Sequence, residues 1–248
     1  MLMTRMALLI PFYNEEGRFD LLKLKELATS SPTYLHIYLI DDGSSDSLSD
    51  MLTSYIEASG IKNISILKSA RNLGKAEALR FGLCNIKLDD LLYIGFTDAD
   101  FSADPTEILR LAEIALQSKG ELILGCRVKT GKNLISTTRF RYLQGELFSR
   151  VSSAFLGHHL VDVQCGLKYI PVDERLKSAI SLPFMNRWLL DLELLLRLNR
   201  DAPIYIQEIH LQKWVHITGS KVRILDVFAI SVALVRLRGK YGKLKILK

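Results

Sequence analysis

Short apolar runs alternate with amphipathic segments through the first half of the chain, and this alternation restricts the fold more than any other feature. The runs predict buried strands at residues 7–10, 37–40, 64–67, 91–96 and 122–124. Apolar residues recur at helical spacing after Asp46 and after Asp104, where Pro105 is a favoured first residue of a helix. Repeated strand–helix–strand units predict an α/β fold: a Rossmann-like, mainly parallel sheet flanked by helices, with ligands bound outside the carboxyl ends of the strands.

The distribution of charge divides the chain into two parts. The net charge is +6, and residues 221–248 alone carry +7, from eight basic residues and one acid. Basic residues that bind nucleic acid are normally interleaved through the fold, so no nucleic-acid partner is predicted. We therefore expect a globular domain at residues 1–220 and a basic, amphipathic C-terminal helix and tail at 221–248. Within the domain, the weaker apolar pattern of residues 132–185 predicts loops and helices laid over the sheet.

The C-terminal segment is apolar as well as basic. Its longest apolar run, residues 227–235, is far shorter than the ~20 residues that cross a bilayer as a helix, so no membrane span is predicted. Such a segment can lie on an anionic membrane, pack against its own domain or contact a second subunit, and the sequence leaves these alternatives open. The first residues lack a signal-peptide pattern, which predicts a cytoplasmic protein, with peripheral contact to the cytoplasmic face of the membrane as one option.

Polar motifs follow the first two predicted strands. Pro11, Tyr13 and Glu15 lie at the end of the first strand, and Asp42 lies in the Asp- and Ser-rich residues 41–46 after the second. A carboxylate there can accept the N–H groups of a base or the hydroxyls of a ribose, and a Tyr ring can stack on a base. The same residue types also build turns and helix caps, so either motif alone supports both interpretations.

Two acids follow the fourth predicted strand. Asp98 and Asp100 are alternate residues of an extended segment, so both carboxylates can face one ion. A hard divalent cation takes oxygen ligands and is commonly held by one or two carboxylates together with phosphate oxygens, which makes Mg2+ or Mn2+ the predicted cofactor. The alternative is a pair of solvated loop acids, which the preceding buried strand makes less favoured.

A lysine opens the helix that follows the third predicted strand. Lys75 and the free N–H groups of that helix can face an anion such as a diphosphate. The chain contains no P-loop, no dinucleotide-binding glycine motif and no nucleophile elbow, which argues against an NTPase, a dehydrogenase or a serine hydrolase.

Taken in order, these motifs resemble glycosyltransferase family 2, and within it the polyprenyl-phosphate glycosyltransferases, especially dolichyl-phosphate glucosyltransferase-like proteins. The resemblance extends over nearly the whole chain. The segments that carry it are 10–15, 41–46, 71–75, 98–100, 125–127, 162–166, 188–194 and 214–221.

The resemblance implies a GT-A fold and a role for each matching residue. The residues that it assigns to the nucleoside are Pro11, Tyr13, Glu15 and Asp42. It assigns Asp98 and Asp100 to the metal and the diphosphate, and Arg127 to a phosphate of the nucleotide sugar. Asp162 matches an acid near the reacting centre, where it would act as a base or position the acceptor.

These inferences predict an inverting, metal-dependent hexosyltransferase, with Asp100 and Asp162 as its catalytic acids. It would transfer a hexose, with glucose from UDP-glucose favoured, to a polyprenyl-phosphate-type acceptor. Two alternatives remain: a family 2 glycosyltransferase that acts on a saccharide or protein hydroxyl, and a non-catalytic nucleotide-sugar-binding protein. The oligomeric state is not predicted.

Overall fold

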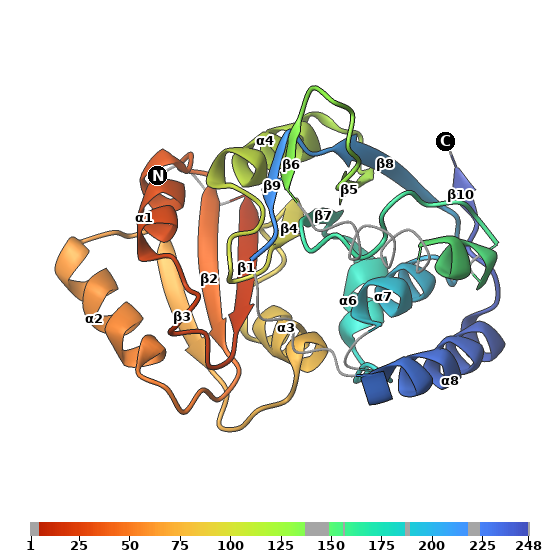
Figure 1. Ribbon diagram of the computed structural model, residues 1–248, viewed down its shortest axis with the longest axis horizontal. Coiled ribbons are helices and arrows are strands. Elements are labelled where there is room, and N and C mark those ends of the chain that lie inside the picture. The colour runs from red at the N-terminus through yellow and green to blue at the C-terminus, as the bar shows by residue number, and fades with distance from the viewer. Residues whose placement is uncertain (1–4, 137–148, 156, 187–188, 218–223, 248) are drawn as a thin grey trace.

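The computed structural model describes residues 5–136, 149–155, 157–186, 189–217 and 224–247 (Figure 1). The strands are β1 (Met6–Phe12), β2 (Leu35–Asp41), β3 (Ile64–Lys68), β4 (Tyr93–Phe96), β5 (Leu122–Cys126), β6 (Leu134–Ser136), β7 (Lys168–Pro171), β8 (Ile204–His210), β9 (Lys213–Val215) and β10 (Ile246–Leu247). The helices are α1 (Leu21–Ser30), α2 (Leu48–Ser59), α3 (Lys75–Asn85), α4 (Pro105–Gln117), α6 (Glu174–Ile180), α7 (Leu190–Leu198) and α8 (Ile224–Tyr241).

Eight strands form one sheet in the order β10-β8-β5-β7-β4-β1-β2-β3, and β6 pairs with β9 in a second, two-stranded sheet. All neighbours in the large sheet run parallel except at β7, which is antiparallel to both β4 and β5. The predicted α/β fold with a mainly parallel sheet is confirmed, and every predicted strand overlaps an observed one.

The sequence failed to predict β7. Residues 132–185 were expected to form loops and helices over the sheet, but β7 is inserted between β4 and β5. The strand is only four residues long and includes Lys168, so it lacks the apolar run by which the other strands were recognised. Its strand conformation depends on hydrogen bonding to both neighbours, which a local pattern does not reveal.

The sheet separates two hydrophobic cores. On one face, strand residues pack against α1, α2 and α4, and on the other against α3, α6, α7 and α8. Within β1, Leu8 and Ile10 belong to the first core, whereas Ala7 and Leu9 belong to the second. Because successive side chains point to opposite faces, a strand that is buried on both faces reads as a continuous apolar run.

The described part of the C-terminal segment is packed on the domain. From α8, Ala233, Leu234 and Leu237 join the core that contains α7, and β10 extends the sheet by pairing with β8. Among the helices in the described ranges, none is long and apolar enough to cross a membrane. The boundary predicted between residues 220 and 221 lies outside the described residues.

A close contact between β4 and β7 gives a test of this core. A Cβ added at Gly95 would lie 2.4 Å from Cε1 of Tyr169, whose fully buried side chain donates a hydrogen bond to the Ile108 carbonyl. We predict that Gly95→Ala lowers the free energy of unfolding by about 1–3 kcal/mol through overpacking. Urea denaturation would measure this loss.

Gly17→Ala is the matched control, because an added Cβ at Gly17 meets no atom within 4 Å. An equal effect of the two substitutions would contradict the packing of β4 against β7.

Candidate active site

Parallel pairing places the carboxyl ends of β1 and β2 side by side, with Phe12 opposite Asp41. The loops that follow are joined through Asn14, whose backbone N–H donates to Ser44 Oγ at 3.1 Å and whose Oδ1 accepts from the Ser45 N–H at 2.8 Å. Asn14 has a φ of +49°, in the left-handed region that Asn tolerates better than most residues. This linkage holds the two predicted nucleoside loops as one unit.

Asp42 connects these loops to a third one. Its buried carboxylate accepts hydrogen bonds from the backbone N–H groups of Leu73 and Gly74 at 2.7 and 2.8 Å, and from Asn72 Nδ2 at 3.1 Å. It therefore organises the loop that leads into α3 and Lys75. Its predicted contact with a nucleoside stays a prediction.

Glu15 lies at the same edge and is held by an arginine that the sequence analysis did not select. Arg18 donates from Nε and Nη2 to the two oxygens of Glu15, at 2.7 and 2.5 Å. These hydrogen bonds raise the pKa of the Arg18 guanidinium, and the charges of Asp98 and Asp100 add to the effect. Arg18 thus links the predicted nucleoside end of the site to its predicted metal end.

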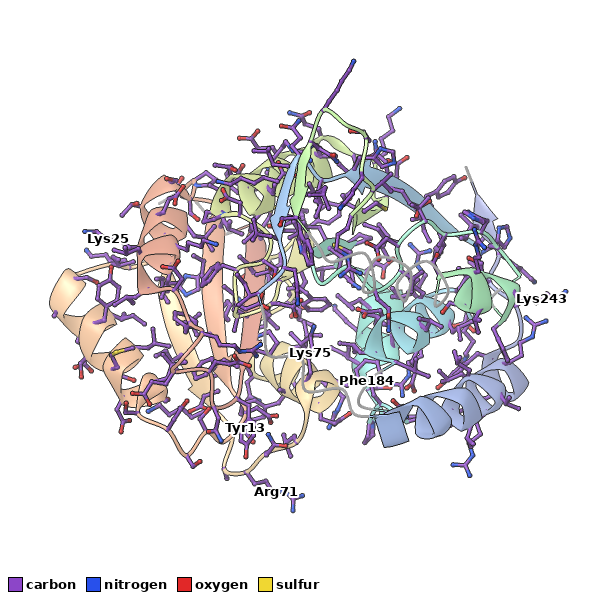
Figure 2. The ribbon with its side chains drawn as sticks, viewed as in Figure 1. Tyr13, Lys25, Arg71, Lys75, Phe184 and Lys243 are labelled. Atoms are coloured by element: carbon purple, nitrogen blue, oxygen red, sulfur yellow. The ribbon has the colours of Figure 1, made fainter. Side chains whose placement is uncertain are left out.

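Lys75, the first residue of α3, is labelled in Figure 2. It forms an ion pair with Asp98, which follows β4. Burial by itself raises the pKa of the Asp98 carboxyl, but Lys75, with help from Arg127 and Lys168, outweighs it and lowers that pKa. Burial likewise opposes the charge of Lys75, yet Asp98 and Asp191 raise its pKa above the usual value. Both groups are therefore charged at neutral pH.

Asp100 is in a different environment from Asp98. Its Oδ1 accepts the Ser102 backbone N–H at 2.9 Å, while burial and the neighbouring charge of Asp98 raise its pKa. A cation between the two carboxylates would relieve this repulsion, and carboxylate oxygens suit a hard divalent ion. Over the described ranges, no group of three or more His, Cys, Asp or Glu side chains could hold a metal, so Asp98 and Asp100 are the two candidate carboxylate ligands.

Gly166, from the segment that precedes β7, lies close to the Asp98 carboxylate. A Cβ added at Gly166 would lie 2.2 Å from Asp98 Oδ2, so only glycine allows the chain after Asp162 to approach this closely. The approach brings the loop of residues 162–166 to the metal end of the site.

Arg127 and Asp162, which were expected to face a phosphate and the acceptor, bind one another. Arg127 donates to Asp162 from Nε at 2.7 Å, from Nη2 at 2.8 Å and from its backbone N–H at 3.0 Å. Burial alone would lower the pKa of Arg127, but this bidentate contact raises it. The guanidinium also lies over the Trp214 ring, 5.3 Å from its centroid. The structure thus places both predicted residues at the sheet edge, in one ion pair.

Lys168 and Asp191 are additional members of the site. The Lys168 side chain is only 4% exposed, and its ammonium pairs with Asp191 and contacts the Val163 carbonyl oxygen at 3.4 Å. Asp191 lies in the first turn of α7, a favourable position for a carboxylate. Asp191 is a charged residue inside an apolar run, which was its available signal, whereas β7 offered no such run around Lys168. The sequence could not show that the two residues meet.

The sheet and its edge define an α/β protein of the nucleotide-binding type, with carboxylates and cations gathered at the carboxyl ends of parallel strands. The model of the family Glycosyl transferase family 2 matches residues 7–168, and the chain belongs to this family.

Curated relatives include two dolichyl-phosphate beta-glucosyltransferases. The Dictyostelium discoideum protein is 29% identical over 95% of this chain and 74% of its own length, and the Drosophila melanogaster protein is 26% identical over 88% and 69%. An undecaprenyl-phosphate 4-deoxy-4-formamido-L-arabinose transferase of Klebsiella pneumoniae is 30% identical, over 66% of this chain and 48% of that protein.

Among solved structures, glucosyl-3-phosphoglycerate synthase from Mycobacterium tuberculosis has the same fold. Its complex with Mn2+, UDP-glucose and glycerol 3-phosphate aligns with a TM-score of 0.66 and 19% identity, over 97% of this chain and 81% of that one. The GT-A fold expected from the sequence is confirmed.

The Lys168–Asp191 pair gives a second test. Lys168→Met leaves the Asp191 carboxylate, which is 18% exposed, without its cation, and we predict a loss on the order of 3 kcal/mol in the free energy of unfolding. Replacing both residues, with Lys168→Met and Asp191→Leu, should recover part of this loss. Urea denaturation of the three proteins would measure it.

The control is Lys177→Met, which removes an exposed lysine paired with Asp89 and Glu174 and should cost less than about 1 kcal/mol. A loss in Lys168→Met no larger than that in Lys177→Met would contradict the dependence of the Asp191 carboxylate on Lys168.

Proposed function

We propose that this protein is an inverting, metal-dependent glycosyltransferase that transfers a hexose, with glucose from UDP-glucose favoured, to a polyprenyl-phosphate-type acceptor. The observation that carries the proposal is the Lys75–Asp98 ion pair beside Asp100, located between the nucleoside loops and the Arg127–Asp162 pair. The reaction class follows from the family. The acceptor is inferred from relatives that are named for dolichyl and undecaprenyl phosphates.

On the donor side, the joined loops after β1 and β2 would hold the nucleoside, with Tyr13 stacking on the base and Glu15 held in place by Arg18. Lys75 would contact the diphosphate at the start of α3, where the helix dipole also favours an anion. Asp98 and Asp100 would hold a divalent cation, Mg2+ or Mn2+, which when bound neutralises charge on the departing nucleoside diphosphate. The same fold holds Mn2+ and UDP-glucose in the mycobacterial synthase.

On the acceptor side, Arg127 and Asp162 suit a phosphate. A lipid phosphate is already ionised at neutral pH, so it needs a cation to bind it and no strong base. Arg127 would assist Lys75 at the donor diphosphate and could also reach the acceptor phosphate, and Asp162, paired with Arg127, would orient the acceptor. The acceptor oxygen then forms a bond to the anomeric carbon from the face opposite the leaving group. The bond to the nucleoside diphosphate breaks, its electron pair leaves with the diphosphate, and the configuration inverts.

The experiment is an assay of sugar transfer and donor hydrolysis with UDP-, GDP- and dTDP-hexoses, with and without polyprenyl phosphate. We predict transfer to polyprenyl phosphate that a chelator abolishes. Asp100→Ala should abolish transfer without unfolding the protein, and Asp98→Ala should also weaken donor binding. Asp162→Asn should lower turnover at saturating donor by about 100-fold or more, with little change in donor affinity.

Asp50→Ala, at a side chain that is 89% exposed, is the control and should behave like the wild type. Transfer only to a saccharide or protein hydroxyl would favour the first alternative. Donor binding without transfer or hydrolysis would favour a non-catalytic binding protein. Full activity of Asp100→Ala in a chelator would refute metal dependence.

We also propose that the protein is cytoplasmic and attaches peripherally to the membrane, whose cytoplasmic leaflet is the anionic one. The outer side of α8 exposes Val235 (61%), and the neighbouring α6–α7 loop exposes Leu182 (64%) and Met185 (44%). Lys240 Nζ lies 3.8 Å from Met185 Sδ, which joins the two segments into one basic and apolar surface. This surface would bring the site to a lipid-borne acceptor.

We predict that the protein sediments with anionic liposomes at low salt and is released at high salt, because juxtamembrane basic residues contribute on the order of 1 kcal/mol each and are screened by salt. Binding should be lost when four lysines near the C-terminus become Gln: Lys240, Lys243, Lys245 and Lys248.

The matched control replaces exposed lysines elsewhere by Gln: Lys25, Lys62, Lys87 and Lys119. Figure 2 shows Lys25 and Lys243 at opposite ends of the molecule. Wild-type protein that stays in the supernatant at low salt would exclude peripheral attachment. Equal losses in the two lysine variants would show that net charge, and not this surface, is responsible.

A further inference from the structure

The turn that carries the two acids contains a residue in an unfavourable backbone conformation. Phe101, directly after Asp100, has a φ of +49° and a fully buried side chain. The left-handed region is disfavoured for a bulky L-residue because its Cβ crowds the backbone, so the surrounding contacts must hold Phe101 there. Such residues gather at functional sites, where the strain maintains a geometry that a relaxed chain would lose.

The contacts that hold Phe101 come mainly from α1 and the residues before it. The Phe19 ring meets the Phe101 ring edge to face, with centroids 5.5 Å apart. Lys23, in the first turn of α1, donates from Nζ to the Phe101 carbonyl oxygen at 3.1 Å. One contact fixes the side chain and the other fixes the peptide that follows it. Neither residue belongs to the motifs recognised in the sequence.

The same turn bonds to the Asp98 main chain and to the Asp100 carboxylate. The Phe101 N–H donates to the Asp98 carbonyl at 3.2 Å, and the Ser102 N–H, next along the chain, donates to Asp100 Oδ1 at 2.9 Å. The peptide between Phe101 and Ser102 therefore bonds to Lys23 through its oxygen and to Asp100 through its nitrogen. Rotation of this peptide would move the hydrogen bond that orients the Asp100 carboxylate.

We propose that Lys23 is a positioning residue for the cation site: by holding the Phe101–Ser102 peptide, it orients Asp100 before the cation arrives. The proposal rests on the metal dependence proposed above. Lys23 acts through the backbone and touches neither acid. Its removal should therefore weaken cation binding and leave turnover at saturating cation largely unchanged.

The test is a titration of Mn2+ in the presence of UDP or GDP, whichever promotes binding by the wild type, with free Mn2+ measured by electron paramagnetic resonance. Lys23→Met keeps most of the side chain but removes the donor, and it should raise the Mn2+ dissociation constant about 3- to 10-fold, the range of one net hydrogen bond. Lys23→Arg, which retains a donor, should recover most of the affinity. Lys25→Met, on the same helix and exposed, should bind Mn2+ like the wild type.

Thermal unfolding separates positioning from a general structural role. We expect Lys23→Met and Lys25→Met to unfold within a few degrees of each other while their Mn2+ affinities differ. Equal Mn2+ affinity in Lys23→Met and the wild type would overturn the proposal, as would a weakened affinity that Lys23→Arg does not recover. If the wild type itself binds no Mn2+ with either nucleotide, the proposed metal dependence fails first, and this inference fails with it.

Discussion

The parallel alignment of β1 with β2 on one side and β4 on the other is the constraint on which the rest of the site depends. It brings the carboxyl ends of the three strands to one edge, where the loops after them carry Glu15, Asp42 and Asp98. Hydrogen bonds between neighbouring loops then fix their relative positions. The antiparallel β7 continues the pattern on the other side of β4, because the loop that precedes it delivers Gly166 to Asp98.

Charge balance is the second organising principle of this edge. The cations Lys75, Arg127 and Lys168 pair with the acids Asp98, Asp162 and Asp191, respectively. A partly buried charge without a partner is costly, and an opposite charge beside it offsets part of that cost. These pairs also suit the proposed chemistry. The cations could bind an incoming diphosphate, and the acids could bind a divalent cation.

The two faces of the sheet serve this edge in different ways. On one face, α1 and α4 pack in the same hydrophobic core as Phe101, which follows Asp100 in the turn of the two acids. Phe19 packs against this core. On the opposite face, α7 supplies Asp191. Ala233, Leu234 and Leu237 of α8 share a hydrophobic core with α7. The proposed membrane surface therefore lies on the same face of the sheet as the helix that supplies Asp191.

The sequence by itself determined the α/β class, the parallel half of the sheet and the motifs at its edge, because strands buried on both faces and the loops after them leave local signals. Only the tertiary structure decided that β7 enters the sheet, that Arg127 binds Asp162, that Lys168, Asp191 and Arg18 join the site, and that Lys23 donates to the Phe101 carbonyl. The reason is that each of these depends on contacts between segments far apart in the chain. A single charged residue in an apolar run has no local pattern that shows which partner it will meet.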